Sequence, residues 1–345
     1  MLLYQLRMTQ MKQIIKKLAR YSGLFRLSCW TNRNLLTILM YHGISRPNDN
    51  HGLTNFEGKH RNLDEFEQHL ELFTKYCTPI FLEAAILNRN LPPNPIVLTF
   101  DDGYKNNYTY AFPLLKKYEV PATIFVTTGF VDQTNYIWPD QLEFIIDRAQ
   151  SKNIDFHYEN DQITLELSSD EEKMKTIRSI KDHLKTFSEP KKLLFLDKLQ
   201  KALGVEYDWD KIPSLLLPLT WDQIREMKES GLISIGSHTV THPILSKCTH
   251  EEQRKELMVS QQRITEELGE KCVLFAYPNG RVADYNQDTI RLLKEFGYWG
   301  AVTTNVGYVD GSNRDKFQLN RFGSGGNLDE LGTIVTGLSR LVGTI

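Results

Sequence analysis

Two adjacent carboxylates, Asp101 and Asp102, are the residues best suited to chemistry in this 345-residue chain. They follow an apolar run at residues 95–100 and precede a glycine, a pattern that predicts a buried strand ending in an exposed turn. Neighbouring carboxylates repel each other unless they share a cation or a proton. We therefore interpret the pair as a metal-and-base site. The alternative is an ordinary turn, because Asp and Gly favour turns for local hydrogen-bonding reasons.

Two histidines downstream could complete a metal site with one of these carboxylates. His238 and His242 are four residues apart and follow a second predicted strand at residues 231–237. If the chain turns helical after this strand, the two imidazoles share one helix face and can bind one cation. Two histidines and one carboxylate leave coordination positions open, as a catalytic metal requires for water or substrate.

A third stretch combines a predicted strand at residues 273–277 with a tight turn at residues 278–281, whose backbone N–H groups could face a cavity. With this stretch the sequence resembles a known family, the polysaccharide deacetylases, also called NodB-homology or carbohydrate esterase family 4 proteins. The resemblance covers about residues 38 to 322. The matching motifs are TFDDGY at 99–104, SHTVTHP at 237–243 and FAYPNG at 275–280.

The resemblance implies a role for each matching polar residue. It implies that Asp101 is the general base. It assigns the metal, a divalent ion and usually Zn2+, to three ligands, Asp102, His238 and His242. The turn after the third strand contributes a backbone N–H to the oxyanion hole in the family, which places that donor at Asn279.

The resemblance also implies a surface that contacts the substrate. Tyr277 and Pro278 of the third motif are expected there. Trp299 is expected near the acetyl group, where the family carries an aromatic side chain, and core packing is the alternative for this residue. The expected substrate is an N-acetylated glycan.

The chain departs from the family pattern at two catalytic positions. Ala276 stands where many members carry the arginine that orients the base, and residues 319–321 lack the histidine that acts as general acid. Arg321 could replace the missing arginine, and a salt bridge at the rim is the alternative. His42, after the first predicted strand, could supply the acid function. Its alternative is a hydrogen bond to loop backbone.

The elements that must position these residues alternate between strand and helix, which indicates parallel strands with helices outside. Together with the resemblance, this predicts an α/β fold, a distorted (β/α) barrel of the NodB-homology type over residues 35–345. Strands are expected at 35–41, 95–100, 121–127, 231–237, 273–277, 298–303 and 317–322, and helices at 62–73, 110–118, 251–268 and 288–296.

The alternation is interrupted at about residues 132–219, which predicts a mainly helical insertion. A short hairpin is expected at 155–168, and two helices within 169–203 are expected to break at Pro190. Trp138 and Trp209 flank the insertion. They could stack on sugar rings, which present apolar faces to aromatic side chains, or they could pack the insertion onto the barrel.

The N-terminal segment, residues 1–34, is basic, and no Asp or Glu occurs before Asp49. Apolar residues at roughly helical spacing predict an amphipathic helix, either on an anionic membrane surface or packed on the barrel. No run reaches the ~20 apolar residues of a spanning helix, and no signal-peptide pattern is present. We expect a cytoplasmic protein or one peripheral at the inner membrane face. An extracytoplasmic location stays open, because polymeric glycans lie outside.

Net charge and cysteine spacing argue against some classes of function. A net charge of -2 argues against a nucleic-acid partner, and the four cysteines have no metal or redox spacing, which suggests free thiols. The sequence predicts a metal-dependent hydrolase that removes N-acetyl groups from a glycan or glycan precursor. Alternatives are an O-deacetylase or small cyclic amide hydrolase on the same metal site, and a catalytically weak carbohydrate-binding protein.

Overall fold

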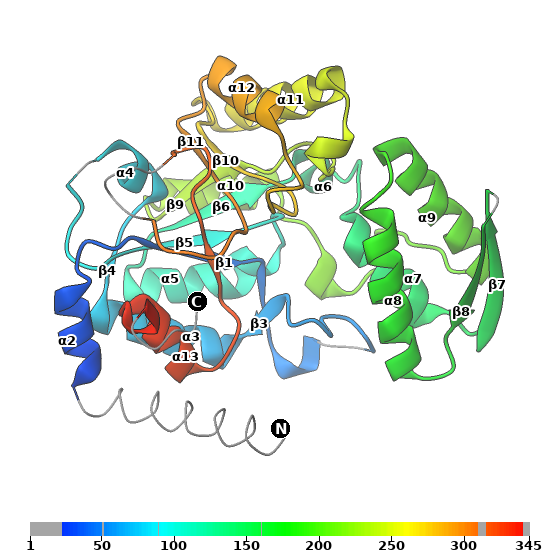
Figure 1. Cartoon of the computed structure of the whole chain (residues 1–345), viewed down its shortest axis with the longest axis horizontal. Helices are drawn as coiled ribbons and strands as arrows, with labels where there is room; N and C mark the ends of the chain where they lie inside the picture. Colours follow the sequence, from blue (N-terminus) through cyan, green and yellow to red (C-terminus); the bar gives the residue numbers. More distant parts are fainter. Residues whose placement is uncertain (1–22, 50–51, 89, 160, 310–314, 341–345) are drawn as a thin grey trace.

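A curled parallel sheet forms the centre of the molecule, for which the computed structural model describes residues 23–49, 52–88, 90–159, 161–309 and 315–340 (Figure 1). Within these residues the sheet has eight strands in the order β11-β10-β9-β6-β5-β1-β12, with β4 paired to β5. Parallel strands buried on both faces are mostly apolar, and all six residues of β5 are buried. The strands are β1 Thr37–Tyr41, β4 Thr78–Pro79, β5 Pro95–Phe100, β6 Ala122–Val126, β9 Ile233–Ser237, β10 Leu274–Ala276, β11 Gly300–Val302 and β12 Phe322–Gly323.

A segment near the C-terminus links the two edges of this sheet. Leu319 forms an isolated parallel bridge with Val302 of β11, and Phe322 pairs with Leu39 of β1. The sheet is therefore curled into a half-barrel, which confirms the predicted distorted (β/α) barrel. The predicted strand at residues 317–322 is wrong in extent: the backbone N–H groups of Leu319 and Arg321 donate to the carbonyls of Ala301 and Asn305, and strand begins only at Phe322.

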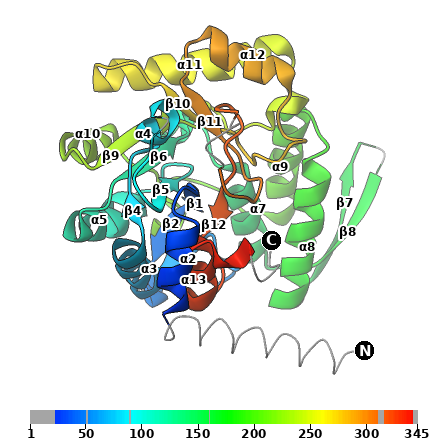
Figure 2. The same cartoon turned by 60° about the vertical axis from the view of Figure 1, so that its left-hand side comes forward.

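Helices cover the outside of the sheet, and α3 illustrates why they form. The Asn62 side chain accepts hydrogen bonds from the amides of Asp64 and Glu65, which caps the helix, and Phe66 and Phe73 are fully buried on its inner face. The covering helices, shown from two sides in Figures 1 and 2, are α3 Leu63–Tyr76, α4 Leu82–Leu87, α5 Phe112–Tyr118, α10 Trp221–Glu229, α11 His250–Leu268, α12 Gln287–Glu295 and α13 Leu328–Val335.

The segment between β6 and β9 builds a separate apolar cluster beside the sheet. Its side chains include Ile145, Phe156, Ile177 and Phe195. Helices α8 and α9 separate just before Pro190, which occupies the first turn of α9, where its missing N–H costs nothing. The elements of this segment are α6 Thr128–Val131, α7 Trp138–Arg148, β7 Asn153–Tyr158, β8 Asp161–Glu166, α8 Asp170–Leu184 and α9 Glu189–Leu203.

Both tryptophans of this segment pack within the protein. Trp138 is 3% exposed, and the Trp209 ring lies against the Tyr136 ring with centroids 4.3 Å apart. Neither side chain lines the cleft that holds the candidate site. Both tryptophans therefore follow the alternative prediction, that they pack the insertion. The stacking of sugar rings on them is not supported.

Only part of the basic N-terminal segment can be compared with its prediction, because residues 1–22 lie outside the described residues. Helix α2 Leu24–Thr31 buries Phe25, Ser28 and Cys29. All four cysteines are free, as expected. Among the residues that the structure describes, no helix is long and apolar enough to cross a membrane.

Candidate metal centre and active site

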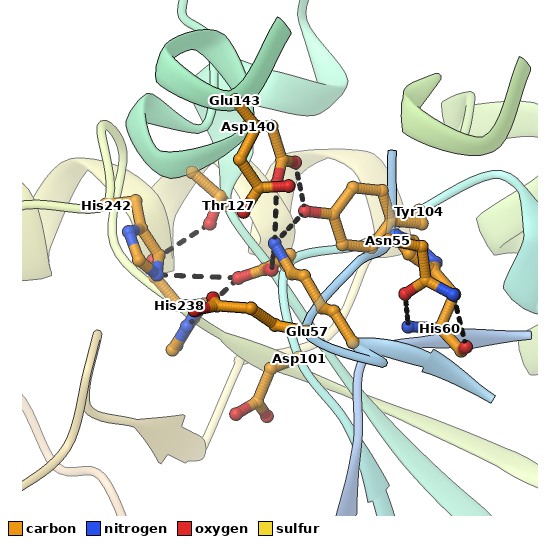
Figure 3. A network of polar contacts seen from close by, with 12 residues as sticks. Asn55, Glu57, His60, Asp101, Tyr104, Thr127, Asp140, Glu143, His238 and His242 are labelled. Atoms are coloured by element: carbon orange, nitrogen blue, oxygen red, sulfur yellow. Dashed lines mark hydrogen bonds and ion pairs between the residues drawn. The ribbon is translucent and has the colours of Figure 1, made fainter. Parts of the chain in front are cut away.

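Three buried side chains converge where strands β5 and β9 end. The Asp102 Oδ1 atom lies 3.5 Å from His238 Nε2 and 3.4 Å from His242 Nε2. One ligand atom from each residue lies within 4.8 Å of the others, and all three residues are buried. In Figure 3 both histidines lie at the left of the polar network and Tyr104 at the right, with Asp140 above the centre. The structure therefore brings together the three predicted metal ligands.

The chain does not turn helical after β9, so the interpretation based on a shared helix face is wrong. Thr239 and His242 adopt left-handed conformations, with φ of 68° and 58°. Glu256 on α11 holds this loop, because its carboxylate accepts hydrogen bonds from the amides of Val240 and Thr241 and from the Thr241 hydroxyl. A strained loop fixed by Glu256, and not a helix turn, brings the imidazoles together.

These residues fit a divalent cation. The His238 Nδ1 atom lies 2.7 Å from the Ala276 carbonyl oxygen, so it donates its proton there and Nε2 keeps a lone pair. Burial lowers the pKa of His242 to about 3, against the opposing effect of Asp102, so this ring is neutral at neutral pH. Asp102 Oδ1 is buried and accepts no hydrogen bond within the described residues. Two imidazole nitrogens and one carboxylate oxygen thus converge as ligand atoms.

The other aspartate is held by a buried arginine. Arg321 Nη1 donates to Asp101 Oδ1 at 2.8 Å and Nη2 to Oδ2 at 2.7 Å, a bidentate pair. Arg321 is 1% exposed, so the alternative of a rim salt bridge is wrong. Burial alone raises the pKa of Asp101, but the charge and hydrogen bonds of Arg321 more than offset this, and the net pKa lies below its ordinary value. Arg321, from the segment that leads into β12, makes the arginine contact that Ala276 cannot make.

Replacing Arg321 by methionine should shift the acid limb of the pH profile. The pKa of Asp101 is held low by Arg321, so without it the pKa rises and a carboxylate base is lost at a higher pH. We expect kcat/KM at neutral pH to fall about 100-fold, with its acid limb moved upward. Arg321→Lys is the matched control, since it keeps the charge without the bidentate geometry. An unchanged pH profile in Arg321→Met would contradict this role.

A lysine missed by the sequence analysis contacts the metal site. Lys59 Nζ lies 3.0 Å from Asp102 Oδ2 and 3.0 Å from Asp140 Oδ1, and it also donates to the Tyr104 hydroxyl. Tyr104 in turn donates to Asp140. Burial raises the pKa of Asp102, but Lys59 and both candidate-ligand histidines outweigh it, and the net pKa is well below the ordinary value. Lys59 therefore holds one Asp102 oxygen while the other faces the histidines.

The Lys59 bridge also joins α7 to the sheet, because Asp140 is on α7. Replacing Lys59 by methionine leaves two buried carboxylates without their cation. We expect the free energy of unfolding to fall by about 2 kcal/mol. This loss is smaller than that for breaking a fully buried ion pair, because the Lys59 side chain is 21% exposed. Urea denaturation measures this. Lys175→Met, which removes an exposed pair with Glu171, is the control and should cost under about 1 kcal/mol. Equal losses would contradict the account.

A cleft of about 550 Å³ opens over both sites. Besides the metal-site residues, its lining includes His42, Tyr277, Asn279 and Arg281. Burial lowers the pKa of His42, partly offset by Asp102, so this imidazole is neutral at neutral pH. The role of His42 as proton donor stays a prediction.

The turn after β10 presents Asn279 to the cleft. Asn279 has a left-handed φ of 60°, and Gly280 follows with φ of 73°. A Cβ on Gly280 would lie 3.0 Å from the Tyr277 carbonyl oxygen, so only glycine fits this turn. No backbone or side-chain acceptor in the described part of the chain takes the Asn279 backbone N–H. This backbone N–H is therefore unpaired within the described residues, as a donor to a ligand must be.

Two predicted substrate contacts do not lie in the cleft. Trp299 is 42% exposed and directly precedes β11, at the end of the sheet opposite the carboxyl ends that carry the metal site. Its backbone N–H donates to Val273, which precedes β10. The expectation that Trp299 lies near the acetyl group is therefore wrong, and so is its core-packing alternative. Pro278 in the turn is buried and is not part of the cleft lining.

Comparison with known proteins identifies the class that this fold and site define. The sequence profile of the polysaccharide deacetylases matches residues 88–301, so the chain belongs to the polysaccharide deacetylase family. The Bacillus subtilis protein YxkH, named as a member of this family, is 25% identical over 277 residues. That match covers 79% of this chain and 65% of YxkH, slightly less than two thirds of its length.

Two further relatives come from other bacteria. The poly-beta-1,6-N-acetyl-D-glucosamine N-deacetylase of Staphylococcus aureus is 42% identical over 45 residues, a match of 13% of this chain and 16% of that enzyme. The Streptococcus pyogenes deacetylase PplD, solved with acetate, superposes with a TM-score of 0.53 and 24% identity over 84% of this chain and 92% of its own. This structural likeness supports the fold.

Proposed function

We propose that this protein is a metal-dependent hydrolase that removes N-acetyl groups from a glycan. The observation that carries the proposal is the pairing of two aspartates with different partners at one cleft. Asp101 is held by Arg321, whereas Asp102 faces two histidine nitrogens. Environments that separate two neighbouring carboxylates in this way give them separate roles, one as a base and one as a ligand.

Asp102, His238 and His242 would hold the cation. When bound, a divalent cation such as zinc polarises the amide carbonyl and lowers the pKa of water, for zinc from 15.7 to about 7. Arg321 keeps Asp101 ionised and oriented, so that Asp101 can accept the proton of the attacking water.

The Asn279 backbone N–H would stabilise the negative charge that develops on the carbonyl oxygen. One such donor typically contributes roughly 3 kcal/mol. A proton must then reach the departing amine nitrogen. His42 is the candidate donor, because it lines the same cleft, and its neutral state requires that it first accept a proton.

The alternatives make different predictions. An O-deacetylase would release acetate without a new amine, and a binding protein would release no acetate. Arg321 on Asp101 favours catalysis over binding alone, since it makes the contact with the expected base that the resemblance assigns to the arginine missing at Ala276.

The experiment that tests the proposal counts acetate and primary amines together. The zinc-loaded protein is incubated with β-1,6-linked and β-1,4-linked N-acetylglucosamine oligomers and with an O-acetylated xylan. We expect one new amine for each acetate released from an N-acetylated oligomer. Acetate from the xylan alone would establish the O-deacetylase, and tight binding of an oligomer without acetate would establish the binding protein.

A further inference from the structure

Helix α2 exposes an apolar ridge to solvent. Leu24, Leu27 and Trp30 are 43%, 58% and 70% exposed, and they follow one another in steps of three residues along the helix. Of the described large apolar side chains, Trp30 is the most exposed. A surface helix normally presents polar residues to water, and a cluster of exposed apolar side chains marks an interaction site.

The opposite face of α2 is fixed to the protein, so the ridge is held outward. The Phe25 ring meets the Tyr76 ring edge to face with centroids 5.7 Å apart, and the Ser28 hydroxyl donates to the Thr336 carbonyl oxygen at 2.8 Å. Gly332 on α13 lies so close to Phe25 that a Cβ there would come within 2.5 Å of the ring. The helix cannot turn its ridge inward without breaking these contacts.

The sequence around the ridge is basic. Residues 1–33 contain no Asp or Glu, although the whole chain has a net charge of -2. The basic residues of this stretch are Arg7, Lys12, Lys16, Lys17, Arg20, Arg26 and Arg33. An anionic bilayer surface offers an apolar interface and negative headgroups. The apolar side chains and the tryptophan suit the interface, and the basic residues suit the headgroups.

We propose that α2 docks the protein on an anionic lipid surface through Leu24, Leu27 and Trp30. The position of the helix suits this role, because α2 lies at one end of the long axis in Figure 1, whereas α8 lies toward the other. The cleft is lined mainly by residues at the carboxyl ends of the strands, such as Asp102 and His238, with Asp140 of α7 and Lys181 of α8 at its side. Helix α2 precedes β1 and so lies toward the other end of the strands. Docking through α2 therefore leaves the cleft free to receive a substrate beside the membrane.

Sedimentation of the full-length protein with lipid vesicles tests this proposal. We expect binding to vesicles that contain phosphatidylglycerol, weaker binding to pure phosphatidylcholine, and release at high salt. The variant Leu27→Glu/Trp30→Glu should bind about tenfold more weakly. Met258→Glu, which adds a charge at a 42% exposed site on α11, is the matched control and should bind like the unaltered protein. Circular dichroism shows that each variant is folded.

A second variant keeps the test decisive if Leu27→Glu/Trp30→Glu does not fold. Arg26→Glu/Arg33→Glu reverses two exposed charges and should also bind phosphatidylglycerol vesicles about tenfold more weakly. The proposal is overturned if the unaltered protein does not bind these vesicles, or if folded variants bind them equally well. It is also overturned if light scattering shows a dimer that the ridge variant abolishes while no vesicle binding occurs.

Discussion

Replacing Asp101 by asparagine is expected to reduce turnover by about 1,000-fold while zinc stays bound. Asn cannot accept the proton of the attacking water, and general-base catalysis typically contributes 10²- to 10⁴-fold. Asp101 bonds to Arg321 and not to the two histidines, so the three predicted ligand atoms keep their places. Acetate release measures turnover, and isothermal titration with zinc measures the affinity of the site.

The control for Asp101→Asn tests whether the protein still folds when buried Arg321 loses its partner. Asp101→Asn leaves Arg321 without its anionic partner, which costs stability, so thermal unfolding must show that the variant is folded at the assay temperature. Near-normal turnover in a folded Asp101→Asn protein would show that Asp101 is not the base. Loss of zinc together with turnover would assign Asp101 to the metal site instead.

Replacing His242 by alanine is expected to lower zinc affinity by more than about 100-fold, because even residues that only support a metal ligand typically contribute 10- to 100-fold. Turnover should fall with occupancy of the site. His250→Ala is the matched control, because His250 is an exposed histidine at the start of α11. The assignment fails if His242→Ala binds zinc as tightly as the unaltered protein does.

The sequence identifies those site residues that directly follow a strand. Asp101 and Asp102 follow β5, and His238 follows β9, so the carboxyl ends of parallel strands bring them to one edge of the sheet. The same rule excludes Trp299 from the cleft, because it precedes β11. The family pattern suggested an aromatic residue there, and strand direction corrects it.

The residues that the sequence analysis missed depend on packing between distant segments. Lys59 precedes the short strand β3 His60–Asn62 and Asp140 is on α7, and neither has a local spacing that relates it to Asp102. Only the tertiary fold places Lys59 Nζ 3.0 Å from Asp140 Oδ1. Tyr104 carried a signal, since it belongs to the TFDDGY motif, but its partners could not be read from that motif.

The role of Arg321 could be predicted from the sequence only in part. Its position near a strand end and the absence of arginine at Ala276 suggested that it compensates. The bidentate contact with Asp101 depends on how residues 319–323 cross between β11 and β1, which is a property of the curled sheet. The same irregular path makes the last strand shorter than the predicted range of residues 317–322.

The most direct test of the central claim is zinc titration of the metal-stripped protein with acetate release from an N-acetylglucosamine oligomer as the readout. The account predicts no release after chelation. It predicts recovery in proportion to added zinc that saturates at one ion per chain, since Asp102, His238 and His242 form one candidate ligand set in the described part of the chain. Full activity in the chelated protein, or tight zinc binding at these residues without any acetate release, would contradict it.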